Sequence, residues 1–147
     1  MNEAFFQDKY PEGLAKTIDT TKYQSVIEVF NTFVAKYADN PAFTCLGQTL
    51  TYAELEEKSA AFAAYLQNET SLVVGDRIAV QLPNVLQYPI VVFGAMRAGM
   101  TVVNTNPLYT EREMEHQFND SGAKALVVLA NMASKAADIL ANTSIET

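Results

Sequence analysis

Several residue types that carry chemistry in proteins are scarce in this chain of 147 residues. It has one cysteine, Cys45, one histidine, His116, and no tryptophan. A single cysteine excludes an intrachain disulfide and fits a reducing, intracellular setting. The same scarcity leaves few candidates for nucleophilic or metal chemistry.

Basic residues and long apolar runs are also few. The chain has 10 lysines and arginines against 17 acidic residues, a net charge of −7. Without a basic cluster, it is a poor match for nucleic acid or for polybasic docking on anionic lipid. The longest apolar run, residues 88–96, is too short to span a bilayer, and the N-terminus lacks the pattern of a signal peptide. We therefore expect a soluble intracellular protein.

The first third of the chain predicts an arm, a helix and a hairpin. Residues 1–24 are polar and aperiodic, which indicates an irregular arm with a turn at 10–13 and aromatics packed on the body. Apolar residues spaced by three and four then predict a helix that ends before Pro41. Residues 42–51 should form a hairpin, with Gly47 and Gln48 as the central residues of a type II′ turn.

From residue 77 onward, strand and helix signals alternate. Short apolar runs predict strands at 77–82, 100–103 and 125–129. Helices are expected at 85–97, after Thr110, and at 132–141. Apolar rather than alternating strands indicate a parallel sheet that is covered on both faces. The predicted fold is α/β: a layered parallel sheet flanked by helices, with an N-terminal helix and a small β-hairpin.

Helix starts carry a recurring pattern, the capping box, in which a Ser or Thr is followed three residues later by Glu. It occurs at Ser25 with Glu28, Thr51 with Glu54, and Thr110 with Glu113. Leu50 with Leu55 and Tyr109 with Met114 are spaced as hydrophobic staples. The stripe expected to be buried on the second helix consists of Leu55, Phe62 and Leu66.

The loop at residues 104–110, NTNPLYT, is the best candidate site by position. Ligands of open α/β sheets gather outside the carboxyl ends of the strands, where Asn104, Thr105 and Asn106 can offer hydrogen bonds. Each residue also has a structural use: the asparagines suit a turn, Pro107 fixes φ, and Thr110 caps the next helix. We favour the structural interpretation, with the corner beside a site.

Two glycines approach the spacing of a phosphate-binding loop. Gly94 and Gly99 form G-x-x-x-x-G, but Met100 stands where a P-loop has lysine. The pair also lies at the end of a helix that leads into a strand, the reverse of the required context. Small residues for close helix–sheet packing explain the pattern better.

Three further candidates have ordinary explanations. His116 lies one helical turn from Glu113 and from Asp120, which allows a weak metal pair, but a solvated helix face is the simpler interpretation. Cys45 lies in a predicted strand with no histidine nearby, so we expect a core thiol rather than a nucleophile. The three clustered carboxylates on the second predicted helix should form a solvated flank; these are Glu54, Glu56 and Glu57.

Longer stretches of the sequence resemble a known family. They are YADNPAF, LTYAELEEKSAAFAAYLQN and GDRIAVQLPNVLQYPIVVFGAMRAGMTVVNTNPLYTEREMEHQFNDSGAKA, with the early YPEG. Together they cover nearly the whole chain and resemble the N-terminal region of bacterial long-chain fatty acid–CoA ligases, in the adenylate-forming superfamily. Residues 25–147 are thereby identified as the N-terminal part of an AMP-binding domain, truncated at its C-terminus.

The resemblance implies a two-step reaction. ATP and a long-chain fatty acid give an acyl-adenylate, which coenzyme A converts to the acyl-CoA, and Mg²⁺ accompanies the ATP. The resemblance also implies a cytoplasmic parent protein with peripheral contact at the inner membrane, and a homodimer.

The working parts of that family do not occur in this sequence. Its Thr/Gly-rich phosphate loop, its acidic ribose-binding residue and its C-terminal lysine are missing. We therefore assign no catalytic, cofactor-binding or metal residue here, and expect an inactive fragment that binds none of the parent's cofactors. Two alternatives stay open: a freestanding non-catalytic α/β binding module, and a fragment of another adenylate-forming branch such as an aryl-CoA ligase or an amino-acid adenylation domain.

Overall fold

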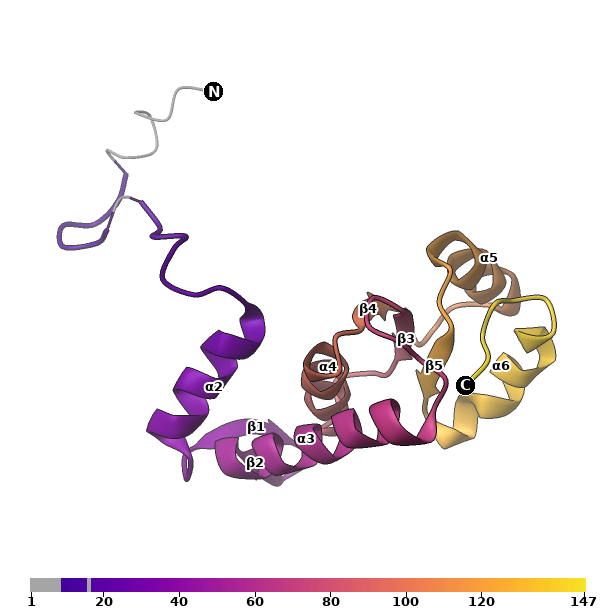
Figure 1. The fold of residues 1–147 in the computed structure, drawn as a ribbon, viewed down its shortest axis with the longest axis horizontal. Coiled ribbons are helices and arrows are strands. Elements are labelled where there is room, and N and C mark those ends of the chain that lie inside the picture. The colour runs from indigo at the N-terminus through magenta and orange to yellow at the C-terminus, as the bar shows by residue number, and fades with distance from the viewer. Residues whose placement is uncertain (1–8, 16) are drawn as a thin grey trace.

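The structure is a computed structural model that describes residues 9–15 and 17–147. Its helices are α2 (Val26–Tyr37), α3 (Tyr52–Glu69), α4 (Gln87–Arg97), α5 (Glu111–Ser121) and α6 (Ala133–Leu140), with the 3-10 turn η1 (Ala130–Met132). Its strands are β1 (Pro41–Cys45), β2 (Gln48–Thr51), β3 (Arg77–Gln81), β4 (Thr101–Asn104) and β5 (Ala125–Val128). The predicted α/β class and the order of the elements are confirmed (Figure 1).

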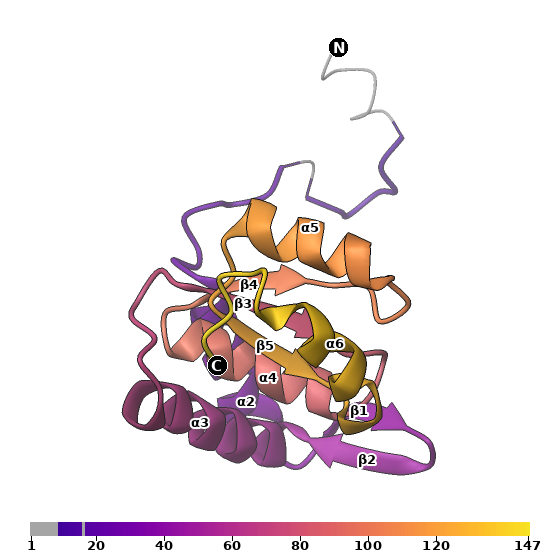
Figure 2. The ribbon, with the colours of Figure 1, turned by 90° about the vertical axis from the view of Figure 1, so that its right-hand side faces the viewer.

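Three parallel strands form the central sheet. Strand β3 lies in the middle, and Ile78 pairs with Val102 of β4 and with Ala125 of β5. Helices α3 and α4 lie on one side of this sheet, and α5 and α6 lie on the other (Figures 1 and 2). The parallel sheet between helical layers is therefore as predicted.

Alternate residues of β3 face the two helical layers. Ile78 packs in a buried cluster with residues of α3 and α4, whereas Ala79 packs with residues of α5 and α6. Both side chains are at most 1% exposed. A strand that is buried on both faces needs apolar residues at successive positions, which explains the unbroken run in the sequence.

Two of the three capping boxes are complete. Thr51 and Thr110 each accept a hydrogen bond from the backbone N–H three residues on, at 3.2 and 3.4 Å. Glu54 and Glu113 accept from the backbone N–H of the capping threonines, at 2.9 and 2.8 Å. These bonds stabilise the charged carboxylates and lower the pKa of both glutamates.

Of the two hydrogen bonds of the capping box predicted at Ser25, one forms and the other is wrong. Ser25 accepts from Glu28 N–H at 3.1 Å, as expected. The Glu28 carboxylate instead accepts from the backbone N–H of Gln24, at 2.6 Å. Ser25 therefore caps the helix, but the Glu28 carboxylate accepts from the residue before the cap.

The predicted type II′ turn is also wrong. Cys45 pairs with Gln48, so Leu46 and Gly47 are the two central residues. Both have positive φ, 50° and 77°, which matches a type I′ turn. This type suits the right-handed twist of the strands but places a leucine where glycine or asparagine is preferred.

The helices of the first layer differ in two details from the sequence prediction. In α3, Leu55 and Leu66 are buried, but Phe62 is half-buried and Ser59, which is fully buried, completes the inner stripe. Helix α4 starts at Gln87 and therefore contains Pro89 in its first turn, where proline costs no intrahelical hydrogen bond.

The described part of the arm, residues 9–15 and 17–24, contains no helix or strand and leads away from the layered body (Figure 1). Leu14 N–H donates to Pro11 O at 3.3 Å, which shifts the predicted turn by one residue. Tyr10 is 48% exposed, so the expected packing of this aromatic on the body is wrong. Tyr23 is half-buried, and the remaining arm aromatics, Phe5 and Phe6, lie outside the described residues.

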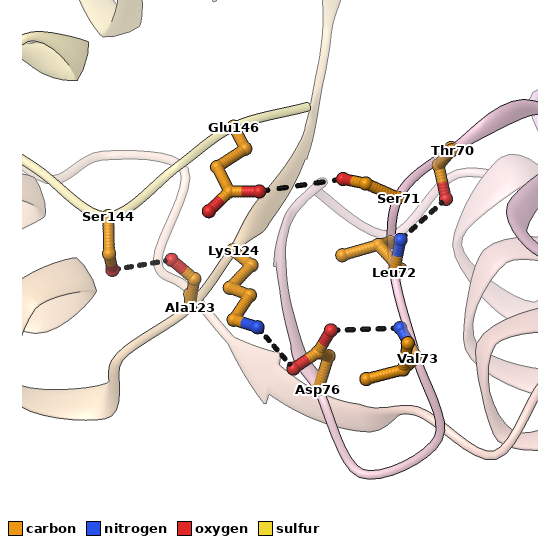
Figure 3. Close-up of polar contacts among 9 residues, drawn as sticks. All are labelled: Thr70, Ser71, Leu72, Val73, Asp76, Ala123, Lys124, Ser144 and Glu146. Carbon is orange, nitrogen blue, oxygen red and sulfur yellow. Dashed lines mark hydrogen bonds and ion pairs between the residues drawn. The ribbon is translucent and has the colours of Figure 1, made fainter.

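The last residues run beside β5. Glu146 N–H donates to Lys124 O at 2.7 Å, and Leu126 N–H donates to Thr147 O at 2.8 Å. The Ser144 hydroxyl donates to Ala123 O at 2.8 Å, and Ser71 reaches Glu146 at 3.4 Å (Figure 3). The segment pairs with β5 through its backbone but does not form a regular strand.

Asp76 links the turn before β3 to the start of β5 (Figure 3). Its carboxylate accepts from Val73 N–H at 2.9 Å and pairs with Lys124 Nζ at 2.9 Å. The hydrogen bond from Val73, followed by the contact with Lys124, lowers the pKa of Asp76. A lowered pKa means that this carboxylate stabilises the fold above its unfolded pKa and that the stabilisation disappears as pH falls.

We therefore expect the stability difference between the wild type and Asp76→Asn to depend on pH. It should be largest near neutral pH and should shrink as pH falls through about 4 and below, where the native carboxylate takes up its proton. Urea unfolding of both proteins at a series of pH values measures this difference. A difference that stays constant across that range would contradict the role assigned to Asp76.

Candidate functional site

The 104–110 loop begins at the carboxyl end of β4, next to the carboxyl end of β3. Thr105 N–H donates to Val80 O at 3.1 Å, so the loop continues the pairing of the sheet for one residue. Thr105 itself is 4% exposed, whereas Asn104 and Asn106 are exposed. The loop thus presents two amide side chains at the edge where parallel sheets bind ligands.

The turn is held by its own residues. The Asn106 carboxamide oxygen accepts from Leu108 N–H at 3.0 Å, and Asn106 O accepts from Tyr109 N–H at 3.1 Å. Tyr109 packs in the same cluster as Met114, as the staple predicted. The structural role expected for this corner is confirmed.

Three side chains from different elements bind Asn104 and Asn106 of the loop, and Lys135 of α6 donates to Tyr109 O at 2.8 Å. Tyr88 of α4 donates to Asn104 Oδ1 at 2.7 Å. Gln117 of α5 donates from Nε2 to Asn104 O at 3.0 Å, and Gln81 of β3 donates from Nε2 to Asn106 O at 3.2 Å. The sequence analysis missed all of these contacts. The available signal was Gln81, a polar residue at the end of an otherwise apolar strand.

The capping threonine of the loop gives a testable expectation. Thr110→Ala should lower the free energy of unfolding by about 1 kcal/mol, because Glu113 N–H loses its acceptor, the Thr110 hydroxyl, and the Glu113 carboxylate loses a donor. Urea melts of the purified chain measure this loss. Thr17→Ala, in the exposed arm, is the matched control and should change little; equal melting of Thr110→Ala and wild type would show that the cap does not stabilise α5.

The glycine pair does not form a phosphate-binding loop. Gly94 lies inside α4, and a methyl group added there would come within 2.8 Å of the backbone oxygen of Ser59. Gly99 has φ of 80° and follows the end of the helix. Close packing was the correct explanation, but Gly94 contacts helix α3, not the sheet as expected.

The acidic cluster on α3 is not a uniform solvated flank. Glu56 forms an ion pair with Arg97 of α4 and is partly buried, so its predicted exposure is wrong. Arg97 also donates to Asn31 Oδ1 of α2 at 3.2 Å and lies 5.4 Å from the ring centre of Phe30. Glu56 therefore helps to join three helices. The other two acids behave as expected, since Glu54 caps α3 and Glu57 is exposed.

His116 and Cys45 were the remaining candidates for metal or nucleophilic chemistry. His116 is exposed on α5, as predicted, and the described residues contain no group of three or more His, Cys, Asp or Glu placed to hold a metal ion. Cys45 is half-buried rather than in the core, and its Sγ donates to Asn84 O at 3.2 Å.

An apolar cavity of about 210 Å³ lies between α2, β1, α3 and α4. Its lining includes Phe30, Phe33, Phe43 and Phe93, and Phe33 and Phe43 are 37% and 43% exposed. Ligand sites usually add a few oriented polar groups to such a lining. This cavity has almost none, so the 104–110 loop remains the better candidate.

Comparison with known proteins decides the family. The profile of the family described as AMP-binding enzyme matches residues 30–146, most of the chain. The chain belongs to this family.

Relatives within the AMP-binding enzymes are similar over nearly the whole chain. A long-chain-fatty-acid–CoA ligase from Haemophilus influenzae is 51% identical over 99% of this chain, and one from Escherichia coli O157:H7 is 49% identical over 95%. The chain spans about a quarter of the length of these relatives, 26% and 25%.

Solved structures of AMP-binding enzymes share the fold. The chain matches a long-chain-fatty-acid-CoA ligase from Archaeoglobus fulgidus with a TM-score of 0.75 at 24% identity, over 83% of this chain and 26% of that one. It matches the N-terminal subdomain of NpsA from Klebsiella oxytoca with a TM-score of 0.70 at 27% identity, over 76% of this chain and 28% of that one.

The residues of this chain do not fit the nucleotide that the family name implies. A phosphate cradle needs converging N–H groups at a strand-to-helix turn, and the glycines available are used for helix packing and a helix end. We therefore derive no chemical step through ATP or a metal ion from these residues. Among the helices of the described part, none combines the length and apolar character that a membrane span requires.

Proposed function

We propose that the chain is the N-terminal part of a bacterial long-chain fatty acid–CoA ligase. The observation that carries this proposal is identity near 50% along almost the entire chain to two ligases of that kind. The longer protein would convert a long-chain fatty acid and ATP to an acyl-adenylate and pyrophosphate. The thiol of coenzyme A would then displace AMP to give the acyl-CoA.

The chemistry explains why such a protein needs more than this segment. A carboxylate is a poor electrophile until one of its oxygens becomes part of a good leaving group, here AMP. The triphosphate charge must be neutralised during that step, a role suited to Mg²⁺ and oriented N–H groups. We propose that residues outside this chain supply those groups, and that residues 25–147 supply a scaffold whose carboxyl edge faces the ligands. The chain alone would bind neither ATP, Mg²⁺ nor coenzyme A and would have no ligase activity.

Further properties of the longer protein belong to the same proposal. Residues 1–24 would be an arm separate from the domain, and two copies of the protein would form a homodimer. The protein would be cytoplasmic, with peripheral contact at the inner membrane and no nucleic-acid partner. The net charge of −7 and the scarcity of basic residues support the last point.

Another adenylate-forming branch is the second candidate. Surfactin synthase subunit 2 from Bacillus subtilis is 33% identical over 79% of the chain. That identity is lower and covers less of the chain than the 51% over 99% found for the fatty acid ligase, so we favour the fatty acid substrate.

Incubation of the longer protein with ATP, Mg²⁺, coenzyme A and one acid at a time tests the proposal. We expect palmitoyl-CoA from palmitate, and little or no product from benzoate or amino acids. Preferred turnover of benzoate or of an amino acid would favour the second candidate, and no turnover of any acid would contradict both. The 147-residue chain in the same mixture should form no palmitoyl-CoA.

A further inference from the structure

Two glutamines hold the 104–110 loop in the same way. The Gln81 amide donates to Asn106 O at 3.2 Å, and the Gln117 amide donates to Asn104 O at 3.0 Å. Each backbone oxygen requires a donor, which fixes the direction of both amides. The glutamines come from β3 and α5, so the loop is held both from the sheet and from a helix.

Each amide leaves its own oxygen without a partner. Gln81 Oε1 and Gln117 Oε1 are buried and have no hydrogen-bond partner among the described residues. Gln81 is 1% exposed, and its Nε2 also contacts Met114 Sδ at 3.1 Å, within the apolar layer under α5. A buried polar atom without a partner destabilises a fold, whereas an apolar side chain of the same shape would not.

The fold therefore gains little stability from having glutamine at these positions. Asn106 O has a second donor, since it also accepts from Tyr109 N–H. Asn104 is an exposed residue, so water can replace the Gln117 amide at its backbone oxygen. What the two amides add is a fixed position for residues 104–106. Tyr88 adds a third bond to Asn104 from α4, on the opposite side of the sheet.

We propose that Gln81 and Gln117 are positioning residues for the ligand-facing loop of the complete ligase. They act through the backbone of Asn104 and Asn106, whose side chains project at the carboxyl edge of the sheet. A loop held by these two amides, the first on a buried residue and the second on a half-buried one, keeps these side chains in one arrangement before a ligand arrives, which lowers the entropy lost on binding. This inference rests on the proposed ligase function.

The variants Gln81→Met and Gln117→Met in the complete protein test the inference. Methionine keeps the volume and flexibility of glutamine but cannot donate to the loop. We expect melting temperatures equal to or above that of the wild type. We also expect the KM for one of the three substrates, ATP, palmitate or coenzyme A, to rise about tenfold, with smaller changes for the other two. The exposed Gln67 of α3 provides the control variant Gln67→Met, which should match the wild type.

Hydrogen exchange of the same proteins provides a second measurement. Backbone amides of residues 105, 106, 108 and 109 should exchange faster in both variants, and those of β3 should not. A lowered melting temperature with unchanged KM values would show that the glutamines are purely structural. Unchanged KM values together with unchanged hydrogen exchange would show that they do not position the loop. Either result overturns the inference. If one variant fails to fold, the hydrogen exchange and the KM values of the other variant test the inference. A wild-type protein without ligase activity would instead contradict the proposed function.

Discussion

Phe118→Ala should lower the free energy of unfolding by about 3–5 kcal/mol. Phe118 lies on the inner face of α5 and is fully buried, in a cluster with Ala79, Met114 and Ile139. Its removal leaves a cavity that the packed neighbours fill only in part, and the lost contacts are those that join α5 to the sheet and to α6. Urea denaturation followed by far-UV circular dichroism measures the change.

The exposed arm provides the control for this experiment. Ile18 is 89% exposed, and Ile18→Ala should change the stability by no more than about 0.5 kcal/mol. Phe118→Leu should fall between the two. A loss below about 1 kcal/mol for Phe118→Ala would mean that the second helical layer does not form the core described above.

Gly94→Val should destabilise the protein by about 3 kcal/mol or more. The first added carbon would lie 2.8 Å from the backbone oxygen of Ser59 and 2.8 Å from Phe62 Cδ1. The phenyl ring can rotate away, but the backbone oxygen moves only if helix α3 moves. The substitution therefore forces apart α3 and α4, the two helices that cover one face of the sheet.

Ala60→Val controls for the effect of a β-branched residue in a helix. Ala60 is exposed on α3, so valine there should cost at most about 0.7 kcal/mol through helix propensity alone. Similar unfolding curves for the two variants would show that α3 and α4 are not in close contact at Gly94.

The sequence predicted local features well because short-range chemistry determines them. The capping threonines and the helix stop before Pro41 each act within a few residues. The apolar strands also predicted the parallel sheet, because a strand covered on both faces has no polar alternation. These features were enough to predict the α/β class and the order of elements from residue 25 onward.

The wrong predictions concern contacts between residues that are distant in the sequence, or which residues pair across the hairpin. The hairpin turn depended on which residue pairs with Cys45, and a shift of one position changed the turn type. The partner of Glu56 is Arg97, 41 positions away, and no local pattern indicates that pair. The burial of Phe62 likewise depended on how α3 packs against α4.

The position of the 104–110 loop at the carboxyl edge of the sheet was predicted, but the contacts that hold it were not, and its role as a site stays a prediction. The rule for parallel sheets located the 104–110 loop, and its turn residues explained its shape. The side chains that hold it are Gln81, Tyr88, Gln117 and Lys135, and the folded chain brings them together only through the pairing of β3 and the packing of three helices.

We propose that this chain forms a scaffold of a ligase and that residues outside it bind the nucleotide. Isothermal titration of the purified 147-residue chain with ATP and Mg²⁺ tests that claim most directly. We expect no saturable heat. Tight binding with one nucleotide per chain, retained against GTP in excess, would contradict the account.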